Sequence, residues 1–443
     1  FRGALDCGAT TVNKQMKIAA AEGIAALARQ QADSALDVAY KGKTLKFGPE
    51  YVIPKPFDSR LVSIVAPAVA QAAMDSGVAR RPIEDMEAYA ASLKANVDQS
   101  FSLMRQIFSS AKKEPKRVVY PEAEDARVLR AAQTLSSEGI CHPVLIGRRD
   151  KVMANIQNLG LNMVEGEDYT FIDPNNHEKH GIYTDVYYNL RKRDGISMSE
   201  AEIIMRSRWT ALGAMMVREG DADSMVVGVT GKFDKFMRAT LDIIPMQPGV
   251  KSPYAIQMIM HKGKVFFIGD TNVNVNPTAE QIAEMACLAA EEVKHFGVEP
   301  SIALLSHSNF GTHRDESALK MQKASHILSE EHPDLMVEGE MQADSALDME
   351  VLRRSFPDAK LEKEANVLIM PNVDTASIAF NLLKKTLSNA DNLGPILLGL
   401  SKPIHILSTY ASVRQIVNMS ALSVVEAQGM DVNVQQLKTA KAL

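Results

Sequence analysis

Residues 117–147 read RVVYPEAEDARVLRAAQTLSSEGICHPVLIG, and from Arg117 onward predicted strands and helices alternate. Residues 117–120 predict a short buried strand, and residues 123–137 predict an amphipathic helix. Residues 143–146 predict a second strand that ends at Gly147. A strand, a helix and a strand in this order are typical of a parallel βαβ unit, because parallel neighbours need a long crossover.

The same pattern continues toward the C-terminus. Four further short apolar runs are bounded by Gly, Asp, Asn or Pro, and amphipathic segments separate most of them. They are residues 225–227, 265–268, 302–305 and 367–370. The alternation predicts an α/β fold with mainly parallel sheets that carry helices on both faces.

The first part of the chain has a different texture. Residues 13–31 and 61–75 predict helices, the second ending near Gly77, and a Gly- and Pro-rich stretch at 47–58 lies between them. Residues 78–114 are charged and mostly helical. We therefore expect one domain over 1–90, a helical linker over 91–116, and a second domain of two subdomains over 117–430.

Composition excludes several classes of protein. The 443 residues carry a net charge of −5 with a pI near 6.1, which argues against general binding to nucleic acid or to a membrane surface. No apolar run reaches the roughly 18 residues of a membrane span. Cys7, Cys141 and Cys287 are isolated, so we expect a reduced, cytoplasmic chain without disulfides. The chain begins at Phe1 rather than Met, which predicts a piece of a longer protein.

Two loops after predicted strands offer groups that bind anions. Parallel sheets bind ligands at the carboxyl ends of their strands, and backbone N–H groups and hydroxyls there can hold a phosphate. The candidates after the strand at 302–305 are Ser306, Ser308, Asn309 and Gly311. Many βα loops have this composition for structural reasons alone. Asn372, after the strand at 367–370, fits a ligand contact or a plain helix N-cap equally well.

Arginines supply the second set of candidates, because a guanidinium group offers two parallel hydrogen bonds to a phosphate. Arg191 opens the basic triplet at 191–193, which is also typical of a solvated helix end. Arg238 follows the Gly-rich loop at 228–232 and is the sharper candidate. That loop does not complete a P-loop. His307 and His405 have no metal-ligand spacing, and we expect no metal site in this chain.

Three N-terminal blocks resemble one enzyme family. Residues 1–6, 17–21 and 47–58 resemble, in their order and amino-acid sequence, the C-terminal part of the nucleotide-binding domain of bacterial malic enzymes. The resemblance implies a Rossmann-like NADP-binding domain over residues 1–90. The matching blocks cover only the C-terminal part of that family's nucleotide-binding domain. The family's acid–base pair, its ligands for Mg²⁺ or Mn²⁺ and its dinucleotide fingerprint are thus expected outside this chain, and no catalytic residue is expected within it.

A second resemblance rests on residues 394–408, GPILLGLSKPIHILS, together with residues 118–122 and 338–344. These blocks are similar to phosphate acetyltransferases, which transfer an acetyl group between coenzyme A and phosphate. The resemblance implies two α/β subdomains with a cleft between them, and a homodimer. Arg191 and Arg238 match the family's phosphate-site arginines, and Ser408 matches its active-site serine. Lys402, Ser408 and Thr409 complete the binding residues that we expect.

The resemblance breaks directly after that serine. Where the family has an arginine and an aspartate used as a base, this chain has Thr409 and Gln415. A threonine cannot replace a guanidinium group, and an amide cannot accept a proton near neutral pH. The substitutions therefore predict that acetyl transfer has been lost.

In this order the two resemblances are similar to fused NADP-dependent malic enzymes, which oxidatively decarboxylate malate to pyruvate. They imply a non-catalytic acetyltransferase-like domain that binds acetyl-CoA as an allosteric effector and supports a larger homo-oligomer. Two alternatives stay open. One is an active phosphate acetyltransferase, and the other is a purely structural oligomerisation module.

Overall fold

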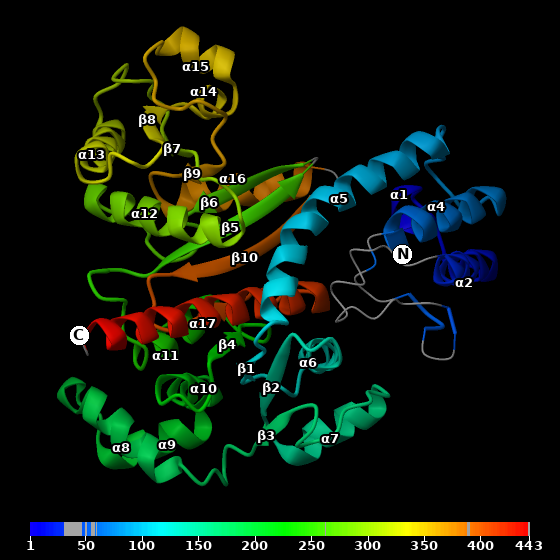
Figure 1. Cartoon of the computed structure of the whole chain (residues 1–443), viewed down its shortest axis with the longest axis horizontal. Helices are drawn as coiled ribbons and strands as arrows, with labels where there is room; N and C mark the ends of the chain where they lie inside the picture. Colours follow the sequence, from blue (N-terminus) through cyan, green and yellow to red (C-terminus); the bar gives the residue numbers. More distant parts are fainter. Residues whose placement is uncertain are drawn as a thin grey trace. The chain divides into compact units, whose positions relative to one another are not determined.

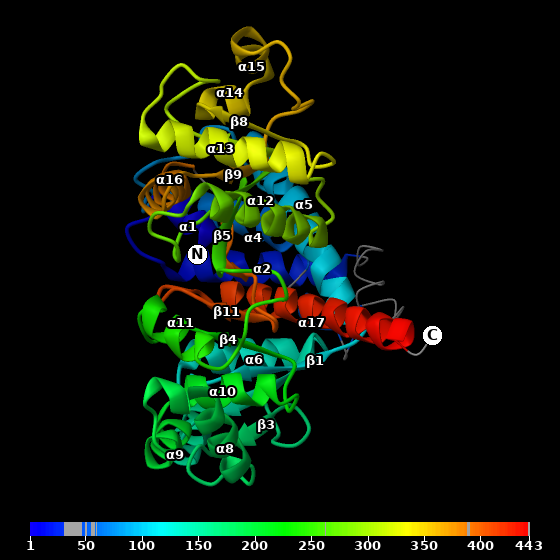
Figure 2. The ribbon, with the colours of Figure 1, turned by 90° about the vertical axis from the view of Figure 1, so that its left-hand side faces the viewer.

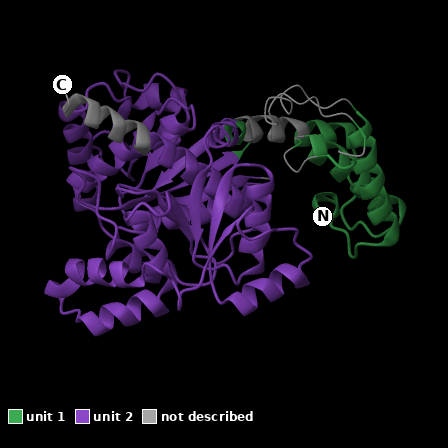
Figure 3. Ribbon diagram, turned by 60° about the horizontal axis from the view of Figure 1, so that its bottom comes forward, with its two compact units in different colours: residues 1–105, 261–263 green, residues 106–260, 264–443 purple. Residues whose placement is uncertain are grey.

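The structure is a computed structural model that describes residues 1–30, 47–48, 51–54, 58, 60–261, 263–387 and 390–441. The chain forms two compact units (Figure 3). The first contains residues 1–105 and 261–263, and the second contains residues 106–260 and 264–443. The change from one unit to the other falls within α5 (Met86–Ala111), which overlaps the predicted linker.

The first unit is helical in the residues that are described. Its helices are α1 (Arg2–Asp6), α2 (Lys14–Arg29) and α4 (Arg60–Asp75), together with most of α5. Asn13 caps α2, because its side-chain oxygen accepts a hydrogen bond from the Met16 N–H at 3.0 Å. Gly77 follows α4 with φ +70°. The two helices predicted here are thus confirmed. Of residues 47–58, the structure describes 47–48, 51–54 and 58, and the Rossmann-like assignment stays a prediction.

The second unit begins with a five-stranded sheet in the order β11-β4-β1-β2-β3 (Figure 1). All of its strand pairs are parallel. Its strands are β1 (Lys116–Tyr120), β2 (Cys141–Ile146), β3 (Thr170–Ile172), β4 (Ser224–Val227) and β11 (Ile404–Ile406).

Side chains along a strand alternate between the two faces of the sheet, so neighbouring residues of β1 pack into different layers. Val119 joins the core on the side of α8, α9 and α10. Tyr120 points to the other side, where its hydroxyl donates to Ser420 of α17 at 2.6 Å. Helices therefore cover both faces.

A six-stranded sheet follows in the order β10-β5-β6-β9-β7-β8. β6, β9, β7 and β8 pair in parallel, while β10 runs antiparallel to β5. The strands are β5 (Tyr254–His261), β6 (Lys264–Gly269), β7 (Ile302–Leu305), β8 (Val337–Met341), β9 (Val367–Ile369) and β10 (Asp391–Leu398). Phe267 of β6 packs on Phe296 at the end of α12, whereas the next residue, Ile268, lies in the core beneath α16.

The helices of the second unit complete these layers, as the two views at right angles show (Figures 1 and 2). They are α6 (Ala126–Ser137), α7 (Arg149–Asn158), α8 (His180–Arg191), η1 (Lys192–Asp194), α9 (Met198–Ser207), α10 (Trp209–Arg218), α11 (Phe233–Leu241), α12 (Ala279–His295), α13 (Glu316–Glu331), α14 (Ala343–Leu347), α15 (Met349–Ser355), α16 (Val373–Thr386) and α17 (Val413–Lys441).

The predicted α/β class with mainly parallel sheets is confirmed. Strands β1, β2, β4, β6, β7 and β9 overlap the six predicted apolar runs. Strands β3, β5, β8, β10 and β11 were not predicted. Among the described residues, no helix is both long and apolar enough to cross a membrane.

Candidate functional site

The loop after β4 holds one of the protein's own carboxylates. Glu122 accepts hydrogen bonds from the backbone N–H groups of Gly228 at 2.6 Å and Val229 at 2.9 Å, and from both the backbone and the hydroxyl of Thr230. Gly228 has φ +110°, and a β-carbon there would lie 2.4 Å from the backbone oxygen of Leu407. The turn therefore needs glycine. Its N–H groups form an anion-binding nest that the Glu122 carboxylate already occupies.

The loop after β7 is organised in the same way. Ser308 is fully buried, and its hydroxyl donates to Glu340 at 2.9 Å. The Gly311 N–H donates to the same carboxylate at 2.7 Å. The Ser306 hydroxyl accepts from the Ser308 N–H, and Asn309 exchanges hydrogen bonds with Gln342. These four predicted anion-binding residues thus have partners inside the protein.

The predicted basic and amide residues lie apart from one another. Arg191 ends α8 and forms ion pairs with Asp194 and Asp242, the latter at 3.1 Å. Arg238 is exposed on α11. Asn372 caps α16, because its side-chain oxygen accepts from the Thr375 N–H at 2.9 Å, which is the N-cap alternative left open by the sequence.

A pocket of about 390 Å³ lies between the two sheets of the second unit and includes the end of the phosphate acetyltransferase-like block. Of the ten predicted binding residues, only Ser408 and Thr409 are among its described lining residues; Lys402 lies half-buried in the turn after β10. The full lining is Gly231, Lys232, Phe233, Gln257, Thr271, Asn272, Ser377, Phe380, Asn381, Lys384, Asn392, Gly394, Pro395, Leu407, Ser408, Thr409, Tyr410, Ala411 and Gln415.

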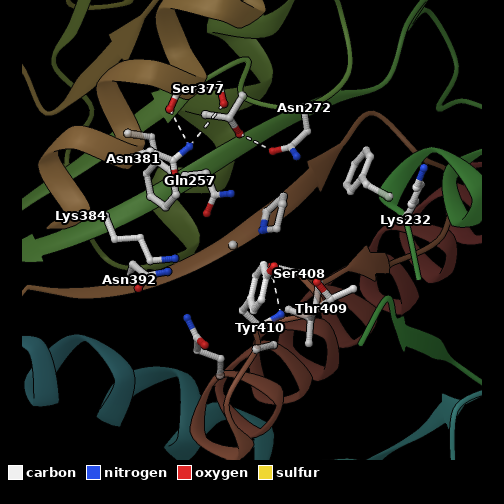
Figure 4. A pocket seen from close by; sticks show the side chains of 18 of the residues that line it. Lys232, Gln257, Asn272, Ser377, Asn381, Lys384, Asn392, Ser408, Thr409 and Tyr410 are labelled. Atoms are coloured by element: carbon white, nitrogen blue, oxygen red, sulfur yellow. Dashed lines mark hydrogen bonds between the residues drawn. The ribbon is translucent and has the colours of Figure 1, made fainter. Parts of the chain in front are cut away.

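The lining has a clear chemical character (Figure 4). It contains two cations, Lys232 and Lys384, together with five amides, several hydroxyl groups and three aromatic rings. None of the described lining residues is Asp, Glu or His. The pocket is therefore suited to an anionic ligand with polar and apolar parts, and its described residues offer no carboxylate or imidazole as a general base.

One amide in the wall lacks a partner. Gln257 on β5 is buried, and its side-chain oxygen has no hydrogen-bond partner among the described residues. A buried acceptor without a donor is costly, typically about 1–3 kcal/mol. Gln257 is thus placed to accept a hydrogen bond from an N–H or O–H group of a ligand.

The turn that carries Ser408 and Thr409 is held from its other side. Arg127 at the start of α6 donates to the backbone oxygens of Thr409 at 2.8 Å, Ala411 at 3.0 Å and Val229 at 2.8 Å. Asp125 caps α6 and pairs with the same guanidinium group. The Ser408 hydroxyl in turn accepts from the Tyr410 N–H at 3.2 Å. One arginine thus fixes two loops that form the pocket.

Gln415 has a structural task at the start of α17. Its side-chain oxygen accepts from the Ser412 N–H at 2.9 Å, while the Ser412 hydroxyl accepts from the Gln415 N–H at 3.3 Å. This reciprocal pair is a capping box, which satisfies two N–H groups that the helix itself leaves free. Gln415, which stands where the resemblance expects an aspartate, therefore stabilises the first turn of α17.

Sequence reasoning missed most of the pocket. Ser377, Phe380, Asn381 and Lys384 recur at helical spacing on the pocket side of α16. That spacing is a signal that could have found them, because positions i, i+3, i+4 and i+7 share one face of a helix. Lys232 was noted only as the end of an incomplete P-loop.

Comparisons with known proteins bear on this site. The family model for phosphate acetyl/butaryl transferase matches residues 102–424. A phosphotransacetylase crystal structure from Streptococcus pyogenes superposes with a TM-score of 0.70 at 29% identity, covering 74% of this chain and 98% of that one.

Two curated relatives match nearly the whole chain. The NADP-dependent malic enzyme of Salmonella typhimurium is 46% identical over 428 residues, which are 97% of this chain and 56% of the relative. An NAD-dependent malic enzyme of Rhizobium meliloti is 43% identical, again over 56% of its length. The chain thus spans about half the length of these malic enzymes. Both resemblances found in the sequence are confirmed.

Proposed function

Because this chain belongs to the phosphate acetyl/butaryl transferase family over residues 102–424, we propose that this region binds acetyl-CoA in the pocket as an effector domain. The observation that carries the proposal is the lining itself, which combines Lys232 and Lys384 with no carboxylate among its described residues. Coenzyme A brings phosphates, which suit the Lys232 ammonium group, and amide N–H groups, which suit the unpartnered oxygen of Gln257.

The same lining argues against turnover. Acetyl transfer to phosphate needs cations around the reacting group and a base for the thiol. Thr409 has no charge, and Gln415 is an amide engaged in the capping box of α17. A binding pocket without these groups is suited to sensing an acyl thioester rather than converting it.

The chain spans about half the length of its malic-enzyme relatives, and the proposal extends to a whole protein of that kind. We propose a malic enzyme that oxidises and decarboxylates malate with NADP and Mg²⁺ or Mn²⁺, and that is regulated by acetyl-CoA. Among the described residues, no group of three or more His, Cys, Asp or Glu side chains is arranged to hold a metal ion, so we assign no metal-binding role to them. The proposal includes a homodimer formed through the acetyltransferase-like region and a larger homo-oligomer.

A thermal-shift titration with acetyl-CoA tests the binding step, because a ligand that binds the native state raises the melting temperature. Lys232→Ala should weaken the shift at subsaturating ligand. Arg238→Ala is the matched comparison, since Arg238 is an exposed cation of the adjoining helix and is absent from the pocket lining.

The outcomes separate the alternatives. If Lys232→Ala keeps the wild-type thermal shift and Arg238→Ala reduces it, acetyl-CoA binds at Arg238, as the sequence predicted, and not in this pocket. No shift with wild type would leave the purely structural role. For regulation, malate kinetics of the full-length protein should change with saturating acetyl-CoA, and unchanged kinetics would refute the effector role.

A further inference from the structure

Lys384 on α16 is a half-buried cation that has no acidic partner among the described residues. Its side chain lines the pocket, and its ammonium group lies 5.5 Å from the centre of the Phe380 ring. In the part of the chain that the structure describes, it forms no ion pair. Figure 4 shows its end directed beside Asn392 of β10, within the space that Ser408 and Tyr410 face from the other side.

This position changes the chemistry of the amine. Burial, together with the neighbouring Lys385 ammonium group, lowers the pKa of Lys384. A lower pKa leaves a larger fraction of the amine neutral near pH 7, and the neutral amine is the nucleophile. Lysines that react covalently with carbonyl compounds are commonly activated in this way.

The pocket also supplies neighbours for an acyl group. Asn392 faces Lys384 from β10. Asn381, three residues before Lys384 on α16, instead donates its side-chain N–H groups to Ser377. Side-chain amides donate hydrogen bonds to carbonyl oxygens, and such donors stabilise the negative charge that develops when an amine attacks a carbonyl. The described lining residues include no carboxylate, which would stabilise the protonated, non-nucleophilic form of the amine.

We propose that the ε-amine of Lys384 is an acyl acceptor, modified by an acyl thioester bound in this pocket. This inference rests on the proposed function and adds a covalent step to it. The neutral amine attacks the thioester carbonyl, a C–N bond forms and the C–S bond breaks. The thiolate leaves and takes up a proton, and the nitrogen loses one, so the products are an acetyl-lysine and a free thiol.

Acylation has a consequence for binding. It converts a cation of the pocket into a neutral amide, and one of the two positive charges available to an anionic ligand is lost. The modified domain therefore binds acetyl-CoA more weakly. High acyl thioester concentrations therefore acylate Lys384 and lower the affinity of the pocket for acetyl-CoA.

The experiment is to incubate the chain with isotope-labelled acetyl-CoA and to follow labelling of each lysine by peptide mass spectrometry. Lys385 is the internal control, because it is the adjacent residue, is exposed, and is absent from the pocket lining. We expect Lys384 to be labelled at least about tenfold faster than Lys385, because binding raises the local concentration of the thioester. An excess of unacylated coenzyme A should slow labelling of Lys384 and leave that of Lys385 unchanged.

Two further measurements separate this inference from the function beneath it. A thermal shift with acetyl-CoA but equal labelling of both lysines would overturn the acyl-acceptor role and leave ligand binding intact. No thermal shift and no protection by coenzyme A would overturn both. Lys384→Arg, which keeps the positive charge, should retain a thermal shift with acetyl-CoA but lose the acetyl labelling that coenzyme A slows. If another pocket residue of this variant is labelled as strongly and is protected by coenzyme A, the reaction belongs to that residue.

Discussion

Arg127 on α6 holds the backbone of Thr409, because its Nη1 atom donates to the Thr409 oxygen at 2.8 Å. The same guanidinium group reaches Ala411 and Val229, residues more than a hundred positions away along the chain. A planar group with several fixed donors can serve three oxygens at once, which an ammonium group cannot do in the same geometry.

Arg127→Lys should therefore destabilise the protein and weaken acetyl-CoA binding together. Loss of hydrogen bonds from a charged donor costs about 2 kcal/mol, which corresponds to a fall in melting temperature on the order of 5 °C. Differential scanning fluorimetry with and without acetyl-CoA measures both effects. Arg130→Lys, on the exposed side of the same helix, is the control and should change neither. Equal behaviour of the two variants would contradict the role of Arg127.

Glu122 gives a prediction about stability alone. In Glu122→Gln, one carboxylate oxygen that now accepts N–H groups of the loop after β4 becomes an NH₂ group that faces donors. We expect a loss of about 3 kcal/mol in the free energy of unfolding, as for other buried charged acceptors. Urea unfolding followed by circular dichroism measures it. Glu124→Gln breaks a pair with the largely exposed Arg148 and should cost at most about 1 kcal/mol.

The α/β layers could be predicted from the sequence, but the residues that line the pocket could not. Strands such as β7 are continuous apolar runs, so pattern alone locates them. β8 reads VEGEM and β10 begins with Asp391 and Asn392, and neither shows the apolar run expected of a buried strand. For Ser308 and Gly311, composition identified groups able to bind an anion but not that Glu340 already occupies them. Whether a donor is free depends on tertiary contacts, which one sequence does not reveal.

A buried acidic cluster predicts how stability depends on pH. Glu292 of α12 and Glu426 of α17 are both buried, and Glu426 accepts from or pairs with His405 at 3.0 Å. Burial, and secondly the Glu426 carboxylate, raise the pKa of Glu292 to about 7. The pKa of His295 is also raised, by its hydrogen bond to Glu292.

For both groups the folded protein holds its proton more tightly than the unfolded chain, so unfolding releases protons between the two pKa values. Stability should consequently fall as the pH rises from about 5 to 8. Melting temperatures across this range should show the decline, and Glu292→Gln should flatten it. A wild-type melting temperature that rises toward pH 8, or a variant with an unchanged slope, would show that this cluster does not control the pH response.

The last prediction concerns acetyl transfer. We expect no formation of acetyl-CoA from acetyl phosphate and coenzyme A above background in a coupled thiol assay. Loss of one oxyanion-stabilising donor typically costs about 10²–10³-fold in turnover, and a positioned base contributes roughly another 10²–10⁴-fold. The two losses need not multiply, since groups that act together are not additive. Clear turnover by the wild-type chain would instead establish an active transferase.

The double variant Thr409→Arg with Gln415→Asp restores the two residue types of the family and should give at most a trace of activity. The structure supplies a reason for that limit. Gln415 closes the capping box with Ser412, and the shorter aspartate side chain reaches the Ser412 N–H less well, at a cost of about 1 kcal/mol. Thr409→Arg alone leaves the capping box intact and serves as the stability control. If the double variant turned over rapidly, the rest of the pocket would have kept the geometry for transfer, and the loss would lie in these two positions alone.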